Sequence, residues 1–353
     1  MRMAFFRQGL GPPATVLFLL LAAACSAPEQ AVSTSGDVMG TSLSMTVVAT
    51  SVAPGVVEAD LAAALDQVRA VDARMSNWRQ DSEISLLNRA GAGRPFHISP
   101  QLAGVLRLGL RISRLTNGAF DMTTLPLVER WGFLRQPGAE LAFPTEAEIG
   151  ELHARVGWRY VTVDDGGNVR FSRDGVMLDL GGIAKGFGVD AAFSYLRKKG
   201  YRNILVEIGG ETRSLGHNPR GRPWRIGIRN PRRGQAESFI AIVDGSRAAV
   251  ATSGDYENFF FHDGKRYSHV IDPATGWPVR NGVCSATVVA DECAYADALA
   301  TALMVLGVEK GMRLVDGLAG VEALMAVRNT DDTVSLFYSK GMKAKEVSGR
   351  QVN

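Results

Sequence analysis

The sequence has 353 residues, enough for one large domain or two small ones, and its 46% hydrophobic content can supply a substantial core. The formal net charge is only +3 at pH 7, and Arg2 and Arg7 of residues 1–24 account for two of those positive charges. So small an excess of basic residues argues against a nucleic-acid-binding protein, in which basic residues are clustered and in large excess.

The first residues have the layout of an export signal. A positively charged start precedes an apolar run, Ala14 to Ala24, that is too short to span a bilayer as a stable helix. The small residues before Cys25 resemble a bacterial lipoprotein signal, in which Cys25 becomes the lipidated first residue, although Leu21 lies one position upstream of the commonest pattern. The alternative is an ordinary cleaved signal with an incidental cysteine.

Composition also predicts how the chain is divided. Residues 26–36 are small and polar, as a tether between a membrane and a domain would be. No later segment has the composition of a linker between two domains. We therefore expect four parts: a signal peptide over 1–24, a tether over 25–36, a single domain over 37–345 and a C-terminal tail over 346–353.

Hydrophobic periodicity predicts the elements in chain order. The first half should contain a strand over 41–50, a long helix over 56–75, a short helix after MSNWRQDSE, and helices over about 100–115 and 145–156, the last capped by Thr145. Strands then dominate, at 160–165, 168–173, 176–180, 203–210, 224–230 and 239–245, with a helix ending at Lys198 among them and a hairpin on Asp263-Gly264 after them.

The last segment should form a strand over 283–290, helices over 293–306 and 308–316, and two closing strands. Helices and strands thus come in blocks and do not alternate strictly, which favours an α+β fold over a doubly wound parallel sheet.

The segment LDLGGIAKGFGVD, residues 178–190, is the first candidate for a ligand site. It is not a P-loop, because Phe187 follows Lys185-Gly186 where a serine or threonine is required. A dinucleotide fingerprint fits poorly, since its glycines would lie inside the helix. Asp179 at a predicted strand end could accept a hydrogen bond from a flavin or base, a Gly182 carbonyl could bind a hard cation, and Lys185 suits a phosphate. The alternative is a glycine-rich turn with a solvated lysine.

Two further segments carry polar side chains with chemical potential. Asp297 and Thr301 lie four residues apart on one face of a predicted helix, and their oxygens suit magnesium; taken alone they are equally explained as a surface aspartate and a packing threonine. His269, near a strand end in SHVIDPATGWPV, can remove a proton from a hydroxyl group, although a lone histidine on a strand is more often structural.

Cysteine and histidine spacing offers no other metal site. Cys284 and Cys293 remain once Cys25 is set aside, and the sequence does not decide whether they pair. The five histidines are scattered, with no cysteine or second histidine at metal-ligand spacing, which argues against zinc.

Eight segments in order resemble the FAD:protein FMN transferase family, the ApbE flavin transferases, and together they span nearly all of the chain after the signal. They are MGTSLSMTV, MSNWRQDSEISLLN, GAFD, LDLGGIAKGFGVD, VEIGGE, TSGDYENFF, SHVIDPATGWPV and ADALATALMVLG. Each is short, but their common order is specific. The lipoprotein-like start is also found in many members of the family.

The resemblance implies a single ApbE-type domain that binds FAD and a divalent cation, usually Mg²⁺, and transfers FMN to a threonine or serine hydroxyl of a target protein, releasing AMP. It implies a metal site formed by the Gly182 carbonyl, Asp297 and Thr301. It implies FAD contacts at Met39, Trp78, Ala119, Phe120, Asp121, Asp179, Lys185 and Ile271. The position of Trp78 is often tyrosine in the family, which keeps a stacking surface but changes its polar group.

The remaining expectations concern chemistry and partners. His269 is the candidate for accepting the proton of the target hydroxyl, and Lys185 would add positive charge near the phosphates. The resemblance implies an exported flavin-carrying target, such as a subunit of a respiratory NADH:quinone oxidoreductase, and a lipid-anchored enzyme at the periplasmic face of the inner membrane. Two alternatives remain open: an FAD pyrophosphatase that releases FMN and AMP, and a lipid-anchored flavin-binding protein without catalysis.

Overall fold

The computed structural model describes residues 29–134, 142–232 and 238–346. The predicted signal peptide, Cys25 and residues 347–353 lie outside this range. No helix in the described part is both long and apolar enough to cross a membrane.

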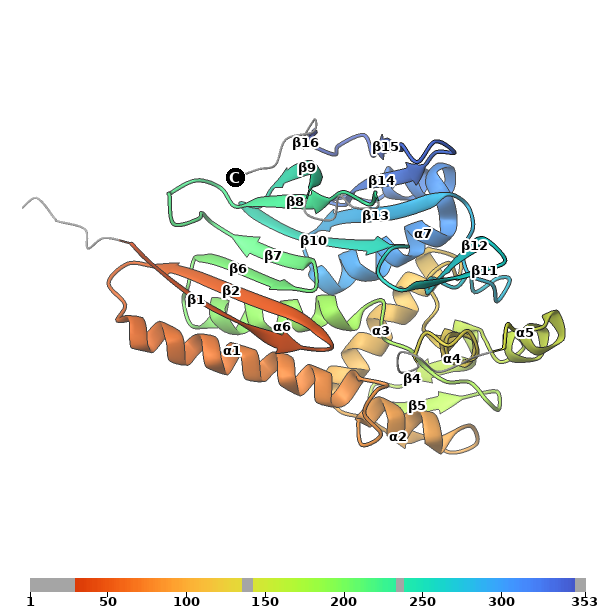
Figure 1. The fold of residues 1–353 in the computed structure, drawn as a ribbon. Helices are drawn as coiled ribbons and strands as arrows, with labels where there is room; N and C mark the ends of the chain where they lie inside the picture. Colours follow the sequence, from red (N-terminus) through yellow and green to blue (C-terminus); the bar gives the residue numbers. More distant parts are fainter. Residues whose placement is uncertain (1–28, 135–141, 233–237, 347–353) are drawn as a thin grey trace, which may run out of the picture.

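An antiparallel sheet of eight strands forms the centre of the molecule (Figure 1). Its order is β1-β2-β6-β7-β10-β13-β14-β15, and every neighbouring pair is antiparallel. The strands are β1 Gln30–Val38, β2 Thr41–Ala49, β6 Asn203–Ile208, β7 Glu211–Leu215, β10 Arg247–Gly254, β13 Val283–Ala290, β14 Glu322–Arg328 and β15 Val334–Tyr338.

Three long helices cover one face of this sheet: α1 Pro54–Met75, α6 Ala184–Lys198 and α7 Cys293–Val315 (Figure 1). The opposite face of the sheet carries a three-stranded sheet, β8 Arg225–Arg229, β9 Phe239–Asp244 and β16 Ala344–Glu346. Because side chains alternate along a strand, Ala249 of β10 packs toward the helices while Ala248 and Val250 pack against β8 and β9.

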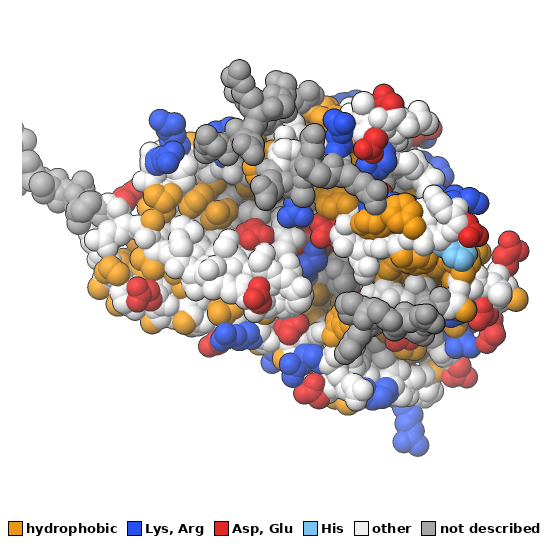
Figure 2. Space-filling view, in the orientation of Figure 1, with side chains coloured by type: hydrophobic (Ala, Val, Ile, Leu, Met, Phe, Trp, Pro, Cys, Tyr) orange, Lys and Arg blue, Asp and Glu red, His pale blue; other side chains and the backbone are white. Residues whose placement is uncertain are grey.

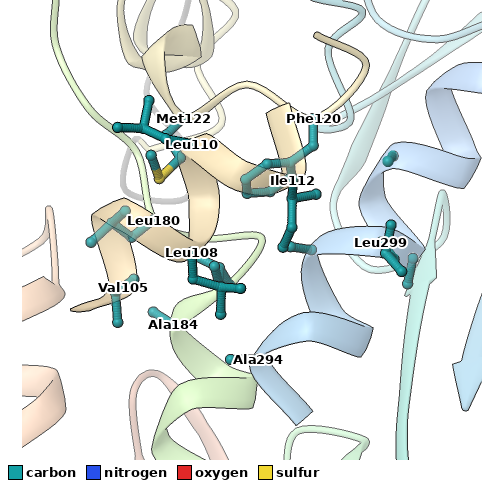
Figure 3. Packing of buried hydrophobic residues seen from close by; sticks show 14 of the residues in the cluster. Val105, Leu108, Leu110, Ile112, Phe120, Met122, Leu180, Ala184, Ala294 and Leu299 are labelled. Carbon is teal, nitrogen blue, oxygen red and sulfur yellow. The ribbon is translucent and has the colours of Figure 1, made fainter. Parts of the chain in front are cut away.

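The remaining elements gather at one end of the sheet. They are α2 Glu83–Ala90, α3 Pro100–Leu115, α4 Leu125–Arg130, α5 Glu146–His153, the 3₁₀ turns Met122–Thr124 and Trp158–Tyr160, a small sheet of β3 Phe96–His97, β5 Asn168–Phe171 and β4 Val161–Val163, and a hairpin of β11 Phe259–His262 and β12 Lys265–Ser268. In Figure 3, Leu108 and Ile112 of α3 lie between the loop residue Phe120 and the helices that carry Ala184 and Leu299, so α3 joins this end to α6 and α7.

The fold is α+β in a single domain, as expected, and most predicted elements are present. Thr145 caps α5 in a complete capping box with Glu148. The two helices expected over 293–306 and 308–316 are confirmed: they carry the single label α7, but Gly307, with a φ of 73°, breaks the helix between them.

Three predictions of local structure are wrong. Residues 176–180 are not a strand; Leu178 and its neighbours are extended, and the backbone of Leu178 bonds to the Asn88 side chain instead of to another strand. The tether cannot extend to residue 36, because β1 begins at Gln30 and pairs along its length with β2. The main-chain hydrogen bonds of a ladder do not depend on apolar side chains, so a polar segment can form an edge strand. Glu346, assigned to the tail, belongs to β16.

Candidate functional site

A cavity of about 450 Å³ opens where α6 and α7 meet the far end of the sheet. It is lined by every residue for which the sequence predicts a flavin contact, a metal contact or proton transfer: Met39, Trp78, Ala119, Phe120, Asp121, Asp179, Gly182, Lys185, His269, Ile271, Asp297 and Thr301. Figure 2 shows acidic and basic side chains next to one another at the centre of the face in view, with hydrophobic side chains beside them. Residues from segments far apart in the chain therefore form one site.

The first turns of α6 and α7 are held together by reciprocal caps. Neither helix has a side-chain cap from its own N-cap residue. Instead Asp297 of α7 accepts a hydrogen bond from the backbone N–H of Gly186 in α6, at 3.0 Å. Asp190 of α6 accepts from the N–H groups of Cys293 and Ala294 in α7, at 3.0 and 2.9 Å. Each helix thus satisfies amide donors that the other leaves unpaired.

Glycine allows this close approach. A Cβ atom on Gly186 would lie 2.4 Å from the carbonyl oxygen of Cys293, closer than real Cβ atoms come. A Cβ atom on Gly182 would lie 2.9 Å from the Thr301 hydroxyl and 3.3 Å from the ring of Phe120. A larger residue at Gly186 would push α6 away from the backbone of α7, and one at Gly182 would displace the side chains of Thr301 and Phe120.

The residues predicted to hold a metal ion fit a hard divalent cation. Asp297 is 2% exposed, and its burial raises the pKa of its carboxyl group, a cost that a bound cation would offset. Thr301 lies one helical turn further along α7, and the Gly182 backbone packs directly against it. Carbonyl, carboxylate and hydroxyl oxygens are the donors that magnesium prefers. Within the described residues, no three His, Cys, Asp or Glu side chains come together as metal ligands, so only one carboxylate, that of Asp297, would contribute to this site.

Lys185 reaches the cavity from the first turn of α6, but it is not free. Its ammonium group lies 2.5 Å from Oε1 of Glu211, a side chain that is 1% exposed. Burial lowers the pKa of Lys185, but the carboxylates of Glu211 and Asp297 raise it by more. The pKa is therefore above that of an ordinary lysine, and Lys185 stays charged. Burial raises the pKa of Glu211, while the positive charge of Lys185 lowers it and favours the ionised carboxylate.

His269 follows β12 and lines the cavity. Its Nδ1 lies 3.1 Å from the carbonyl oxygen of Asn258. A carbonyl can only accept, so Nδ1 donates and the neutral ring keeps Nε2 unprotonated. Burial and the nearby charge of Lys185 lower the pKa of His269 below its usual value. This histidine is therefore in the basic form at neutral pH, as proton removal requires.

The two aspartates predicted to contact FAD have different surroundings. Oδ1 of Asp179 accepts hydrogen bonds from the Asn77 side chain and the Gly181 backbone. The carboxylate of Asp121 is used within the protein, since it accepts from the backbone and hydroxyl of Thr123 and from the backbone N–H of Trp158. Burial raises the pKa of both carboxyl groups.

The aromatic contacts also differ in exposure. Trp78 is 61% exposed at the cavity, an unusual position for so large an apolar side chain unless a ligand covers part of it. Phe120 is only 4% exposed and belongs to the core beside α3.

Sequence reasoning missed several residues of the site. Asn77 and Asn258 orient Asp179 and His269, and the hydroxyl of Ser253 lies 3.1 Å from that of Thr301. Glu211 lies in the segment VEIGGE, and its place directly after a Gly-Gly turn is a signal that could have identified it. Cys284 and Cys293 are both buried and unpaired, so the structure contains no disulfide between them.

Comparison with known proteins shows which family this chain resembles over most of its length. A family model described as the ApbE family matches residues 39–325. The FAD:protein FMN transferase of Vibrio cholerae is 40% identical over 329 residues, covering 92% of this chain and 96% of that protein. The protein of the same name from Haemophilus influenzae is 35% identical over 309 residues, with 85% and 88% covered.

Solved structures show the same fold. The flavin transferase ApbE from Vibrio cholerae superposes with a TM-score of 0.78 at 38% identity, over 89% of this chain and 98% of that chain. The ApbE protein of Thermotoga maritima superposes with a TM-score of 0.75 at 31% identity, over 87% and 96%. The chain belongs to the ApbE family.

Proposed function

We propose that this chain transfers FMN from FAD to a threonine or serine hydroxyl of a target protein and releases AMP, in a reaction that depends on Mg²⁺. The observation that carries the proposal is the single cavity that gathers the predicted flavin, phosphate, metal and base residues. Relatives named FAD:protein FMN transferase, which cover most of the chain, support the same activity.

Different residues of the cavity would contact different parts of FAD. Trp78 and Asp179 would contact the flavin, while Lys185 in the first turn of α6 would face the pyrophosphate, where its positive charge favours anions. Gly182, Asp297 and Thr301 would hold Mg²⁺, which supplies positive charge to the pyrophosphate oxygens when it is bound. The cavity thus presents positive charge where the leaving group develops negative charge.

The transfer itself needs one proton acceptor. The target hydroxyl oxygen attacks the phosphorus of the FMN moiety, the bond from that phosphorus to the oxygen of AMP breaks, and a phosphoester forms. His269 takes the hydroxyl proton on Nε2, the nitrogen that its bond to Asn258 leaves unprotonated. Phosphoryl transfer relies mainly on positioning and electrostatics, so the base adds to a reaction that the charges already favour.

We further propose that the target is an exported flavoprotein, such as a subunit of a respiratory NADH:quinone oxidoreductase, and that Cys25 carries a lipid which holds the enzyme at the periplasmic face of the inner membrane. Support comes from the family resemblance and from the layout of residues 1–25.

The activity is tested by covalent flavin fluorescence. The purified enzyme is incubated with FAD, Mg²⁺ and an acceptor protein purified without the enzyme, and the acceptor is denatured before its fluorescence is measured. If FMN is transferred, flavin fluorescence stays with the denatured acceptor, and the amount of AMP released equals the amount of flavin attached. AMP without attached flavin would identify a pyrophosphatase, and bound FAD without AMP a binding protein.

The metal site is tested by Asp297→Ala, which should abolish Mg²⁺-dependent labelling because it removes the only charged ligand among the three. Glu309→Ala is a matched control, since Glu309 lies on the same helix but its side chain is 85% exposed and paired with Arg313. Undiminished labelling by Asp297→Ala would rule out the metal assignment.

A further inference from the structure

Glu211 is a buried carboxylate that neither the fold nor the proposed reaction explains. Its side chain is 1% exposed, Oε1 bonds to Lys185, and Oε2 is buried with no hydrogen-bond partner among the described residues. Glu211 does not itself line the cavity, whereas Lys185 does. A buried acid with an unsatisfied oxygen is costly, and such groups cluster at functional sites.

A tight turn sets the position of Glu211. It is the first residue of β7, after a turn in which Gly209 and Gly210 both have positive φ, 60° and 102°. That backbone conformation suits a two-residue hairpin turn. The side chain of Glu207 accepts a hydrogen bond from the Gly210 N–H at 2.7 Å and fixes the turn further. Glu211 is thereby placed over the first turn of α6.

A second ion pair also joins α6 to β7. Asp190 of α6 pairs with Arg213 of β7 at 2.6 Å, so the same two elements are already linked two residues further along the strand. The carboxylate of Asp190 has all its partners within the protein, including the amides of α7. A second ion pair therefore already links the two elements, and the pair of Lys185 and Glu211 differs from it in that Lys185 lines the cavity.

We propose that Glu211 is a positioning residue that holds the Lys185 ammonium group in place for the phosphates of FAD. A lysine ammonium has three N–H donors on a flexible stem. One donor is used by Glu211, and two remain for phosphate oxygens. Fixing the stem before the ligand arrives removes an ordering cost from binding. The inference rests on the proposed function only in taking FAD as the ligand.

The test compares FAD with riboflavin, which has the flavin ring but no phosphate. Dissociation constants are measured by flavin fluorescence at fixed Mg²⁺ concentration. Glu211→Gln keeps the shape of the side chain but removes its charge, and should weaken FAD binding about tenfold while changing riboflavin binding less than about twofold. Glu211→Asp should restore part of the loss. Arg213→Gln, which breaks the other pair, is the matched control and should leave the ratio of the two affinities unchanged.

A double-mutant cycle separates positioning from a general structural effect. If Glu211 acts through Lys185, Glu211→Gln should add less than about twofold to the loss in FAD affinity caused by Lys185→Met. Thermal unfolding and circular dichroism check that each variant folds. An equal loss for FAD and riboflavin, fully additive losses, or tighter FAD binding by Glu211→Gln would each overturn the proposal. Failure of the wild-type protein to prefer FAD over riboflavin would instead count against the proposed function.

Discussion

The contact between α6 and α7 at Gly186 should be sensitive to a single methyl group. In Gly186→Ala the new Cβ would start 2.4 Å from the Cys293 carbonyl oxygen and 2.8 Å from Cα of Ala294. Both atoms belong to backbone, so no side chain can rotate away. The two helix ends must separate by at least about 0.6 Å to reach the closest distance that real Cβ atoms show.

The expected change in stability has two parts. Overpacking typically costs about 1–3 kcal/mol, while replacing glycine by alanine within a helix gains about 1 kcal/mol. We therefore expect a net loss of up to about 2 kcal/mol in the free energy of unfolding, measured by urea denaturation. Because the displacement lengthens the bond from the Gly186 N–H to Asp297, the Mg²⁺ concentration needed for half-maximal transfer should also rise.

Gly104→Ala is the control for the gain from helix propensity. Gly104 lies within α3, is exposed, and a Cβ added there meets nothing within 4 Å. It should stabilise the protein by up to about 1 kcal/mol and leave the Mg²⁺ requirement unchanged. The packing argument is refuted if Gly186→Ala matches Gly104→Ala in stability and the wild-type protein in Mg²⁺ requirement.

Two other predictions concern the base and the anchor. His269→Ala should lower the rate constant of transfer by about 10²–10⁴-fold. Because the pKa of His269 is lowered, the wild-type rate should be constant above pH 7 and fall only below the ordinary histidine value of about 6.5. A pH–rate profile that His269→Ala leaves unchanged would contradict the role of His269 as a base. Cys25→Ser should move the protein from the membrane fraction to the soluble periplasmic fraction and stop its labelling by radioactive palmitate, whereas continued membrane association would contradict the lipid anchor.

The sequence predicts those elements best that have a strong periodicity or a clear boundary. The helix α3 begins at Pro100 and ends at Leu115, as expected, because Ser99 caps it and Asn117-Gly118 ends it. The strand β13 has the predicted bounds because its residues are almost all buried and β-branched or small. The hairpin of β11 and β12 turns at Asp263-Gly264, where both residues have positive φ.

Strands without alternating large apolar residues were not predicted. The strand β7 buries Glu211, Thr212 and Ser214, and β10 is built mainly from alanine, serine and threonine. Both lie in the interior of the large sheet, where the neighbouring strands supply hydrogen bonds and the helices supply apolar contacts. Their order in the sheet depends on long-range pairing, which single-sequence patterns do not contain.

The resemblance predicted residues that the fold brings together around one cavity, but the relations between these residues were not predicted. No pattern places Glu211 beside Lys185, because the two are 26 positions apart and meet only when β7 crosses α6. Likewise the sequence cannot show that the carboxylate of Asp121 is already occupied by Thr123 and Trp158. We therefore expect Asp121 to shape the cavity through the Trp158 loop more than through its own charge.

The glycines of LDLGGIAKGFGVD have a different purpose from those of a phosphate-binding loop. In a P-loop, glycines let backbone amides surround a phosphate. Here Gly182 packs on Thr301, Gly186 on Cys293 and Gly188 near Met39, so each lets another part of the protein approach α6. These contacts bring the α7 residues that would bind a cation next to the lysine that would bind phosphate. The segment resembles a nucleotide motif because a site for a pyrophosphate and a metal also requires close backbone approach, here achieved by packing two helix ends together.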